Sequence, residues 1–118
     1  MSVIDDNRHH IEAALAYSNG THDFESVRDA IIAGTMQLWP AENSAAVTEI
    51  VEYARKTVIN VFLAGGDLDE IASHIDTVAA WGKAQGCDSM TMSGRKGWVR
   101  VLDKHGFEPV FVVMERVL

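Results

Sequence analysis

The turn at residues 93–97 has the residue types that bind anions. Two cations, Arg95 and Lys96, stand between Gly94 and Gly97, and a segment expected to be helical follows. Backbone amides at the start of a helix attract anions, because the helix dipole places partial positive charge there and neighbouring cations add to it. The sequence therefore predicts its best ligand site at these four residues.

The same basic residues also fit a plainer interpretation. Lys96, Arg100 and Lys104 recur at every fourth position, which would align them as one charged stripe on a helix. Such a stripe often serves solubility alone, so the anion site and the solvated stripe both stay open. Trp98 lies within this segment and is expected to anchor a core or an interface.

Histidine and cysteine offer little further chemistry. His9 and His10 are adjacent, so on a helix their side chains would point about 100° apart. The other histidines share no metal-ligand spacing with them or with Cys87. Cys87 follows a glycine that ends a predicted helix, and it is expected to pack as a small apolar group. The sequence thus predicts neither a metal site nor a cysteine nucleophile.

Composition places these residues in one acidic domain. The chain has 118 residues, 47% of them hydrophobic, and a formal net charge of −7, which suits a single globular domain over residues 1–118. Negative charge repels nucleic acid and anionic lipid, and no apolar run approaches the roughly 18 residues that span a bilayer. One cysteine allows no internal disulfide. We therefore expect a cytoplasmic protein that binds neither nucleic acid nor membranes.

Hydrophobic periodicity predicts the helices and strands that must position these residues. Helices are expected at 6–18, 23–34, 68–85 and 95–105, and strands at 35–39, 45–54, 57–63, 88–92 and 107–117. The element order is ααβββαβαβ. Because a long helix joins 57–63 to 88–92, those two strands should be parallel, with a right-handed crossover. The expected fold class is α/β with a mixed, twisted sheet.

Two C-terminal motifs carry a family resemblance. The segments Ala79–Cys87 (AAWGKAQGC) and Val101–Phe107 (VLDKHGF) resemble two parts of the GNAT superfamily of acetyl-CoA-dependent N-acetyltransferases. These parts are the third helix and the short helix that ends in Gly-Phe. The resemblance covers residues 57–117 in detail and residues 1–56 by element order only. It implies a GNAT-like sheet with helices on both faces, acetyl-CoA as cofactor and an amine as acceptor.

A second resemblance is to small GNAT-like proteins encoded by phages and prophages. It rests on Gly65-Gly66-Asp67, Trp81, Gly86-Cys87 and the turn at 94–98. It implies a phage or host protein as partner, and association with the virion as an alternative to a purely cytoplasmic location.

The loop that GNAT enzymes use for the cofactor diphosphate departs from the family pattern. Gly65 and Gly66 stand at the family's glycine positions, and the resemblance makes them cofactor-binding residues. The family's basic residue is missing, and Asp67, Asp69 and Glu70 follow. Asp67 and Glu70 have capping-box spacing, so their oxygens would take the amides that phosphate needs. A cap is worth about 0.5–2 kcal/mol, which favours capping and leaves the acyl-CoA loop as the alternative.

The catalytic positions depart as well. Many family members use a tyrosine of the short helix to protonate the leaving thiolate, and the matching residue is Leu102, which has no proton to give. Carboxylates of the central strands often serve as general base, which makes Glu49 and Glu52 candidates. Strand alternation puts these two on opposite faces, and Glu49 is expected to be the buried one. A purely structural acid is the favoured alternative for Glu49.

Two functions follow from these observations. The favoured one is a phage- or prophage-type GNAT-fold protein with a degenerate acetyl-CoA loop that acts in binding or assembly. The alternative is an N-acetyltransferase in which Gly65 and Gly66 admit the diphosphate, Arg95 supplies the missing cation, and Glu49 or a water acts as base. The final strand at 107–117 leaves an open sheet edge, which favours a homodimer.

Overall fold

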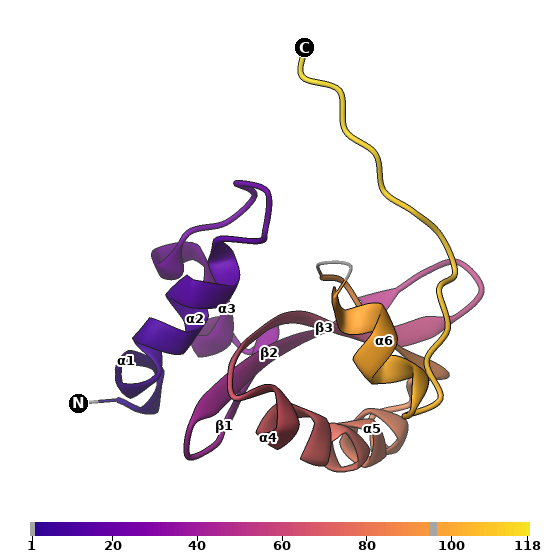
Figure 1. Cartoon of the computed structure of the whole chain (residues 1–118), viewed down its shortest axis with the longest axis horizontal. Helices are drawn as coiled ribbons and strands as arrows, with labels where there is room; N and C mark the ends of the chain where they lie inside the picture. The colour runs from indigo at the N-terminus through magenta and orange to yellow at the C-terminus, as the bar shows by residue number, and fades with distance from the viewer. Residues whose placement is uncertain (1, 95–96) are drawn as a thin grey trace.

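The computed structural model describes residues 2–94 and 97–118 (Figure 1). Its helices are α1 (Val3–Asp6), α2 (Arg8–Leu15), α3 (Phe24–Ala33), α4 (Leu68–Ser73), α5 (Ile75–Ala84) and α6 (Gly97–Asp103). Its strands are β1 (Met36–Pro40), β2 (Ser44–Glu52), β3 (Thr57–Gly66) and β4 (Ser89–Met92). None of the described helices is long and apolar enough to cross a membrane.

The strands form one mixed sheet in the order β1-β2-β3-β4 within the described residues. β1 and β2 are antiparallel, as are β2 and β3, while β3 and β4 run parallel from Val58 opposite Ser89 to Val61 opposite Met92. The parallel pair, joined through α4 and α5, confirms the predicted crossover connection. β3 is central and is buried along most of its length, because strands flank it on both sides and helices cover its faces.

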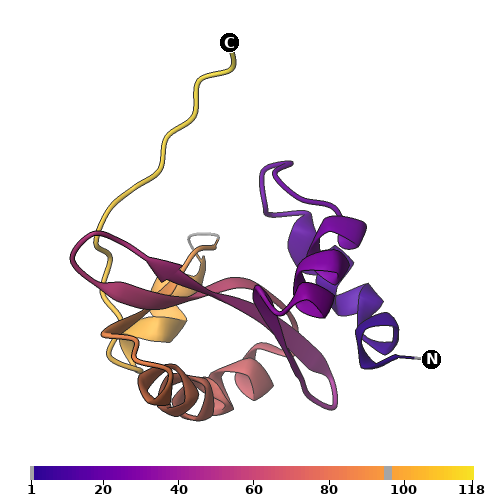
Figure 2. The same cartoon turned by 180° about the vertical axis from the view of Figure 1, so that it is seen from behind.

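Helices cover both faces of the sheet, as predicted (Figure 2). On one face, α2 and α3 contribute Ile11 and Val27 to a buried cluster that also holds Val47 of β2. On the other face, Ile75 of α5 lies in a second cluster, against which Met92 of β4 packs. The predicted α/β fold class with two helical layers is therefore confirmed.

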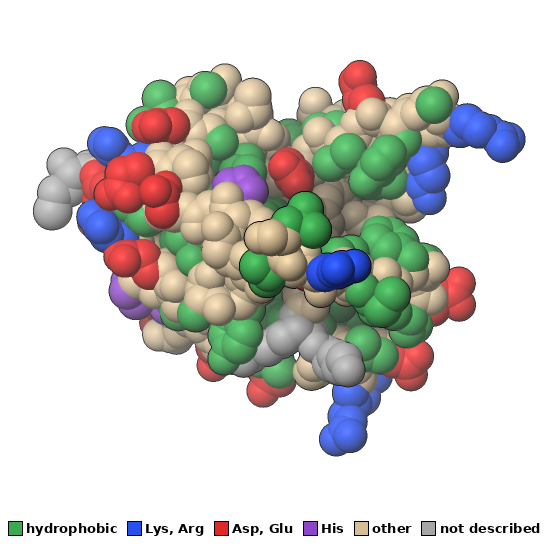
Figure 3. Space-filling view, turned by 90° about the horizontal axis from the view of Figure 1, so that it is seen from above, with side chains coloured by type: hydrophobic (Ala, Val, Ile, Leu, Met, Phe, Trp, Pro, Cys, Tyr) green, Lys and Arg blue, Asp and Glu red, His purple; other side chains and the backbone are tan. Residues whose placement is uncertain are grey.

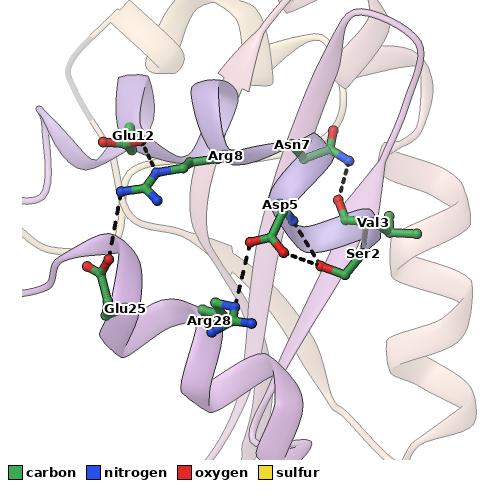
Figure 4. Close-up of polar contacts among 8 residues, drawn as sticks. All are labelled: Ser2, Val3, Asp5, Asn7, Arg8, Glu12, Glu25 and Arg28. Atoms are coloured by element: carbon green, nitrogen blue, oxygen red, sulfur yellow. Dashed lines mark hydrogen bonds and ion pairs between the residues drawn. The ribbon is translucent and has the colours of Figure 1, made fainter.

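Polar contacts tie the three N-terminal helices together (Figure 4). The Arg8 guanidinium pairs with Glu12 at 2.6 Å and with Glu25 of α3 at 3.7 Å. Arg28 of α3 reaches Asp5 of α1 at 3.7 Å. These side chains are about half exposed, so solvent screens the pairs and the apolar cluster contributes most of the packing energy.

Local capping explains where several helices begin and end. Asp23 caps α3 with a bond from the Ser26 amide at 2.8 Å, and Gly34 ends this helix with φ +83°, as predicted. The predicted long helix at 68–85 is instead divided at His74 into α4 and α5. The Ser73 hydroxyl donates to the carbonyl oxygen of Glu70, and the His74 amide donates to Ile71. These bonds to residues three positions back tighten the turn and interrupt the regular helix.

The predicted final strand at 107–117 is wrong. Residues 107–118 form no strand in the described chain, and beyond Phe107 they project from the body (Figure 1). The apolar run at 110–114 is typical of a strand, but a strand also needs a neighbour with which to pair. Pro109 has no amide hydrogen and favours an extended Glu108, so the chain continues outward.

Candidate functional site

The sheet opens where β4 ends. Met92 is the last residue of β4 and lies opposite Val61, and the Ser93 amide donates to the carbonyl oxygen of Val61 at 3.2 Å. β3 continues to Gly66, so its final residues extend beyond the end of β4. The two parallel strands therefore leave a wedge between them at this end.

A cavity of about 340 Å³ occupies the wedge, and we call it the wedge cavity. Its lining comes from the end of α2 and the turn after it, from the last part of β3, from α4, from the segment after β4, and from α6. The lining residues are Ala13, Ala14, Ala16, Tyr17, Ser18, Phe62, Leu63, Ala64, Gly65, Gly66, Leu68, Ile71, Ser93, Gly94 and Trp98. Three of the predicted cofactor-binding residues, Gly65, Gly66 and Gly94, thus meet around one cavity.

The other residues of the predicted anion turn do not all reach this cavity. Gly97 begins α6, outside the cavity lining, and a Cβ placed there would meet nothing within 4 Å. Arg95 and Lys96 lie outside the described residues. The turn is therefore described at Gly94 and Gly97 but not at its two cations.

The glycines of β3 bring the chain's own backbone close together. A Cβ on Gly65 would overlap the carbonyl oxygen of His10 in α2. A Cβ on Gly66 would overlap the carbonyl oxygen of Asn43, and Gly66 also has φ +106°, where side chains are strained. Both glycines lie at the end of β3 rather than in a loop after it. Internal packing therefore requires them whether or not a ligand binds.

Acidic residues after these glycines occupy backbone amides, as the capping interpretation predicts. The Asp67 carboxylate accepts from the Glu70 amide at 3.1 Å, and the Asp67 amide donates to Asn43 at 3.0 Å. The Glu70 carboxylate does not complete the capping box; it accepts from the Asn43 amide at 2.9 Å and from the Ser44 hydroxyl. Glu70 thereby links the β1–β2 turn to α4 through hydrogen bonds.

Hydrogen bonds keep the Glu70 carboxylate charged. The bond from Ser44, followed by the bond from the Asn43 amide, lowers the pKa of Glu70 below its ordinary value of 4.5. At neutral pH a fixed negative charge therefore lies in the first turn of α4, the helix that contributes Leu68 and Ile71 to the wedge cavity.

A row of polar side chains crosses the sheet and ends at the wedge cavity. The buried Asn60 side chain accepts from Thr91 at 2.9 Å and from Ser93 at 3.2 Å, and it donates to Glu49 at 3.4 Å. Glu49 is half-buried, and Ser93 belongs to the cavity lining. The sequence predicted Glu49 as a candidate but not Asn60. Asn60 could have been found because it is the one amide side chain in the otherwise apolar run 58–63.

Comparisons of sequence find no match for this chain among protein-family models or curated proteins. Solved structures do match over nearly the whole chain. The TTHA1254 protein of Thermus thermophilus has a TM-score of 0.66 and 17% identity, covering 99% of this chain and 94% of its own. Glucosamine-6-phosphate N-acetyltransferase from Arabidopsis thaliana has a TM-score of 0.63 and 11% identity, covering 98% and 94%.

The solved structure of a second acetyltransferase also matches the fold of this chain. The ribosomal-protein-alanine N-acetyltransferase from Brucella melitensis biovar Abortus 2308 has a TM-score of 0.63 and 8% identity, covering 96% of this chain and 94% of its own. The chain has the GNAT fold. Identities this low show the fold alone, and the resemblance to phage-encoded GNAT-like proteins stays a prediction.

The wedge of this GNAT fold suits only part of acetyl-CoA. The pantetheine arm is an extended chain that carries amides, and the end of β3 beyond Val61 offers backbone groups along the wedge. The diphosphate does not fit the loop after β3, because the Asp67 carboxylate holds the Glu70 amide, the Asp67 amide donates to Asn43, and the loop is acidic.

The position that many GNAT enzymes give to a catalytic tyrosine is part of the core here. Leu102 of α6 is 6% exposed and lies in the cluster with Ile75 and Trp98. Leucine donates no proton. Trp98 is 9% exposed, which confirms the predicted anchoring role, although one part of it also lines the wedge cavity.

Cys87 and the histidines add no reactive centre to this GNAT fold. Burial, followed by the neighbouring Asp88, raises the pKa of the Cys87 thiol, which disfavours the nucleophilic thiolate. Among the residues that the structure describes, no three His, Cys, Asp or Glu side chains gather as metal ligands would.

Proposed function

We propose that this chain is a GNAT-fold binding module with weak or no catalysis. In this proposal the wedge cavity holds an extended, amide-containing chain without a diphosphate group. A peptide segment of a partner protein has this chemistry, and the sequence resemblance suggests a phage or host protein as that partner.

The shape of the wedge supports an extended ligand. Backbone groups along an unpaired stretch of strand bind a second extended chain by main-chain hydrogen bonds, as in strand addition. The end of β3 provides such a stretch over residues 62–66, and Trp98 supplies an aromatic wall.

The observation that carries the proposal is the protein's own occupation of the loop amides. Asp67 bonds to the Glu70 amide, and the charged Glu70 side chain is held in place by Asn43 and Ser44. Asp69 adds another acid in the same turn. An anionic group would have to displace these bonds and lie beside like charges, which opposes its binding.

The first test compares two ligands that share the pantetheine arm, of which only coenzyme A carries the charged nucleotide diphosphate. Pantetheine is neutral and coenzyme A carries phosphates, so thermal shift and calorimetry at millimolar ligand should show binding of pantetheine and none of coenzyme A. A ligand present at 100 times its Kd stabilises the fold by about 2.7 kcal/mol. Tighter binding of coenzyme A than of pantetheine to the native chain contradicts the proposal.

A charge-reversal pair refines this test. Asp69→Lys places a cation in the first turn of α4, next in sequence to the cavity residue Leu68, and should allow measurable binding of coenzyme A. Asp29→Lys makes the same change in net charge on an exposed position of α3 and serves as the control. If both variants gain the same affinity, overall charge rather than the loop determines the preference.

A second candidate function is acetyl-CoA-dependent N-acetyl transfer to an amine. The polar row favours it, because Glu49 and Ser93 at the cavity both bond to Asn60, so Glu49 lies near the cavity and could deprotonate an amine there through a water. Acetylation of amines by the native chain, reduced at least tenfold in Glu49→Gln, would support this candidate. Absence of coenzyme A binding in the first test removes it.

A further inference from the structure

The C-terminal segment is largely exposed, and the outer edge of β4 pairs with no strand among the described residues. We propose that residues 108–118, which we call the C-terminal arm, lie along β4 of a second copy of this chain. The second copy's arm returns the contact, so the two chains exchange arms in a dimer. The proposal does not depend on which ligand the wedge cavity holds.

The C-terminal arm exposes an unusual amount of apolar surface. Val110 is 72% exposed, Phe111 is 74% exposed and Met114 is 89% exposed. Their neighbours Val112 and Val113 are also exposed, so residues 110–114 form an uninterrupted apolar, uncharged run. Figure 3 shows hydrophobic side chains on the projecting end of the chain, which faces the viewer. Water is a poor environment for such a run, which indicates that it is covered in the working protein.

β4 offers the matching surface. Within the described residues it pairs with β3 alone, and all of Ser89–Met92 is half-buried rather than buried. The buried hydroxyl of Ser89 has no hydrogen-bond partner among the described residues. An open strand edge presents backbone donors and acceptors to an added strand, and β4 carries no charged side chain to oppose that addition.

The start of the C-terminal arm directs it away from its own β4. The Phe107 amide donates to the carbonyl oxygen of Leu102, and the Phe107 side chain packs on the cluster around Trp98. Pro109 then favours an extended Glu108 over a turn back to the body. One contact of the arm with its own body is polar, since Asn19 donates to Glu115 at 2.7 Å. The apolar run therefore stays available to another chain.

A second copy is the occupant that the chain itself specifies. Every copy has one apolar arm and one open β4 edge, so reciprocal exchange satisfies both and closes as a twofold dimer. The net charge of −7 opposes general self-association, but residues 110–114 and Ser89–Met92 are uncharged. Two copies of the chain are thus expected to meet at these two uncharged surfaces and not at the rest of the acidic surface.

The first experiment measures molecular mass by light scattering during size-exclusion chromatography. The full chain should have the mass of two chains, and a chain ending at Glu108 should have the mass of one. Val112→Lys keeps the full length and should also be monomeric, while Arg116→Gln, in the same arm, should stay dimeric. Circular dichroism checks that each variant is folded. A monomeric full chain, or a dimer that survives truncation, overturns the proposal.

The second experiment distinguishes exchange from other contacts of the arm. Each of residues 110–114 is changed in turn to cysteine, and a short bis-maleimide links it to the native Cys87, which lies just before β4. At least one position should give a covalent two-chain product, and Cys87→Ser should abolish it. A linked single chain would place the arm on its own β4. A two-chain product that persists with Cys87→Ser would place arm against arm. Either result, or no linkage at any position, contradicts the proposal.

Discussion

At the scale of single residues, Gly65 and Gly66 show how one motif can have two explanations. Glycines before a helix are typical of a phosphate loop, because a missing Cβ lets a ligand approach the backbone. Here the approaching groups are the carbonyl oxygens of His10 and Asn43. The same absence of a side chain thus serves the packing of α2 and the β1–β2 turn on β3.

Replacing Gly65 therefore tests packing directly. Gly65→Ala should lower the free energy of unfolding by about 1–3 kcal/mol, because its Cβ forces α2 away from β3. Gly97→Ala is the matched control, since a Cβ there meets nothing within 4 Å, and it should leave stability nearly unchanged. Urea unfolding measures both. Equal stability of the two variants would show that α2 does not press on Gly65.

At the scale of elements, Glu70 connects two segments that sequence order keeps apart. Its carboxylate holds the Asn43 amide and the Ser44 hydroxyl, so the turn between β1 and β2 is fixed to the first turn of α4. The bonds favour the charged form and lower its pKa. This contact, together with Asp67, fixes negative charge at the start of α4.

The Glu70 contact gives stability a defined dependence on pH. Because the folded chain binds the Glu70 proton more weakly than the unfolded chain, the stabilisation is present above the ordinary pKa of 4.5. It is lost as the pH falls through the lowered pKa of the folded state. Thermal melts of Glu70→Gln between pH 6 and pH 3 should therefore change less than those of the native chain. Glu52→Gln, at the exposed end of β2, should follow the native curve.

At the scale of the whole molecule, the proposed C-terminal arm exchange makes the stability of the fold depend on dimer formation. A fold that buries its arm only in a second copy gains stability from dimer formation. The melting temperature of the full chain should then rise with protein concentration over a hundredfold range. The chain ending at Glu108 should melt at one temperature throughout. Concentration-independent melting of the full chain would mean that the arm is not buried between copies.

The alternation of helices and strands could be predicted from the order of the residues. The sequence predicted the strand at 57–63 and the helix at 23–34, and the parallel pair followed from the helix between its strands. Asp67 was also recognised as a cap. These features depend on local spacing and capping chemistry, which a linear sequence carries.

Tertiary structure alone decided which residues share a site. Only folding brings Gly65, Gly66 and Gly94 around the wedge cavity and joins Glu49 to the overlooked Asn60. Only folding shows that Glu70 bonds to the β1–β2 turn instead of completing a capping box. The apolar run at 110–114 has a strand's sequence and no strand partner in the described chain, because pairing depends on a neighbouring backbone that no local pattern encodes.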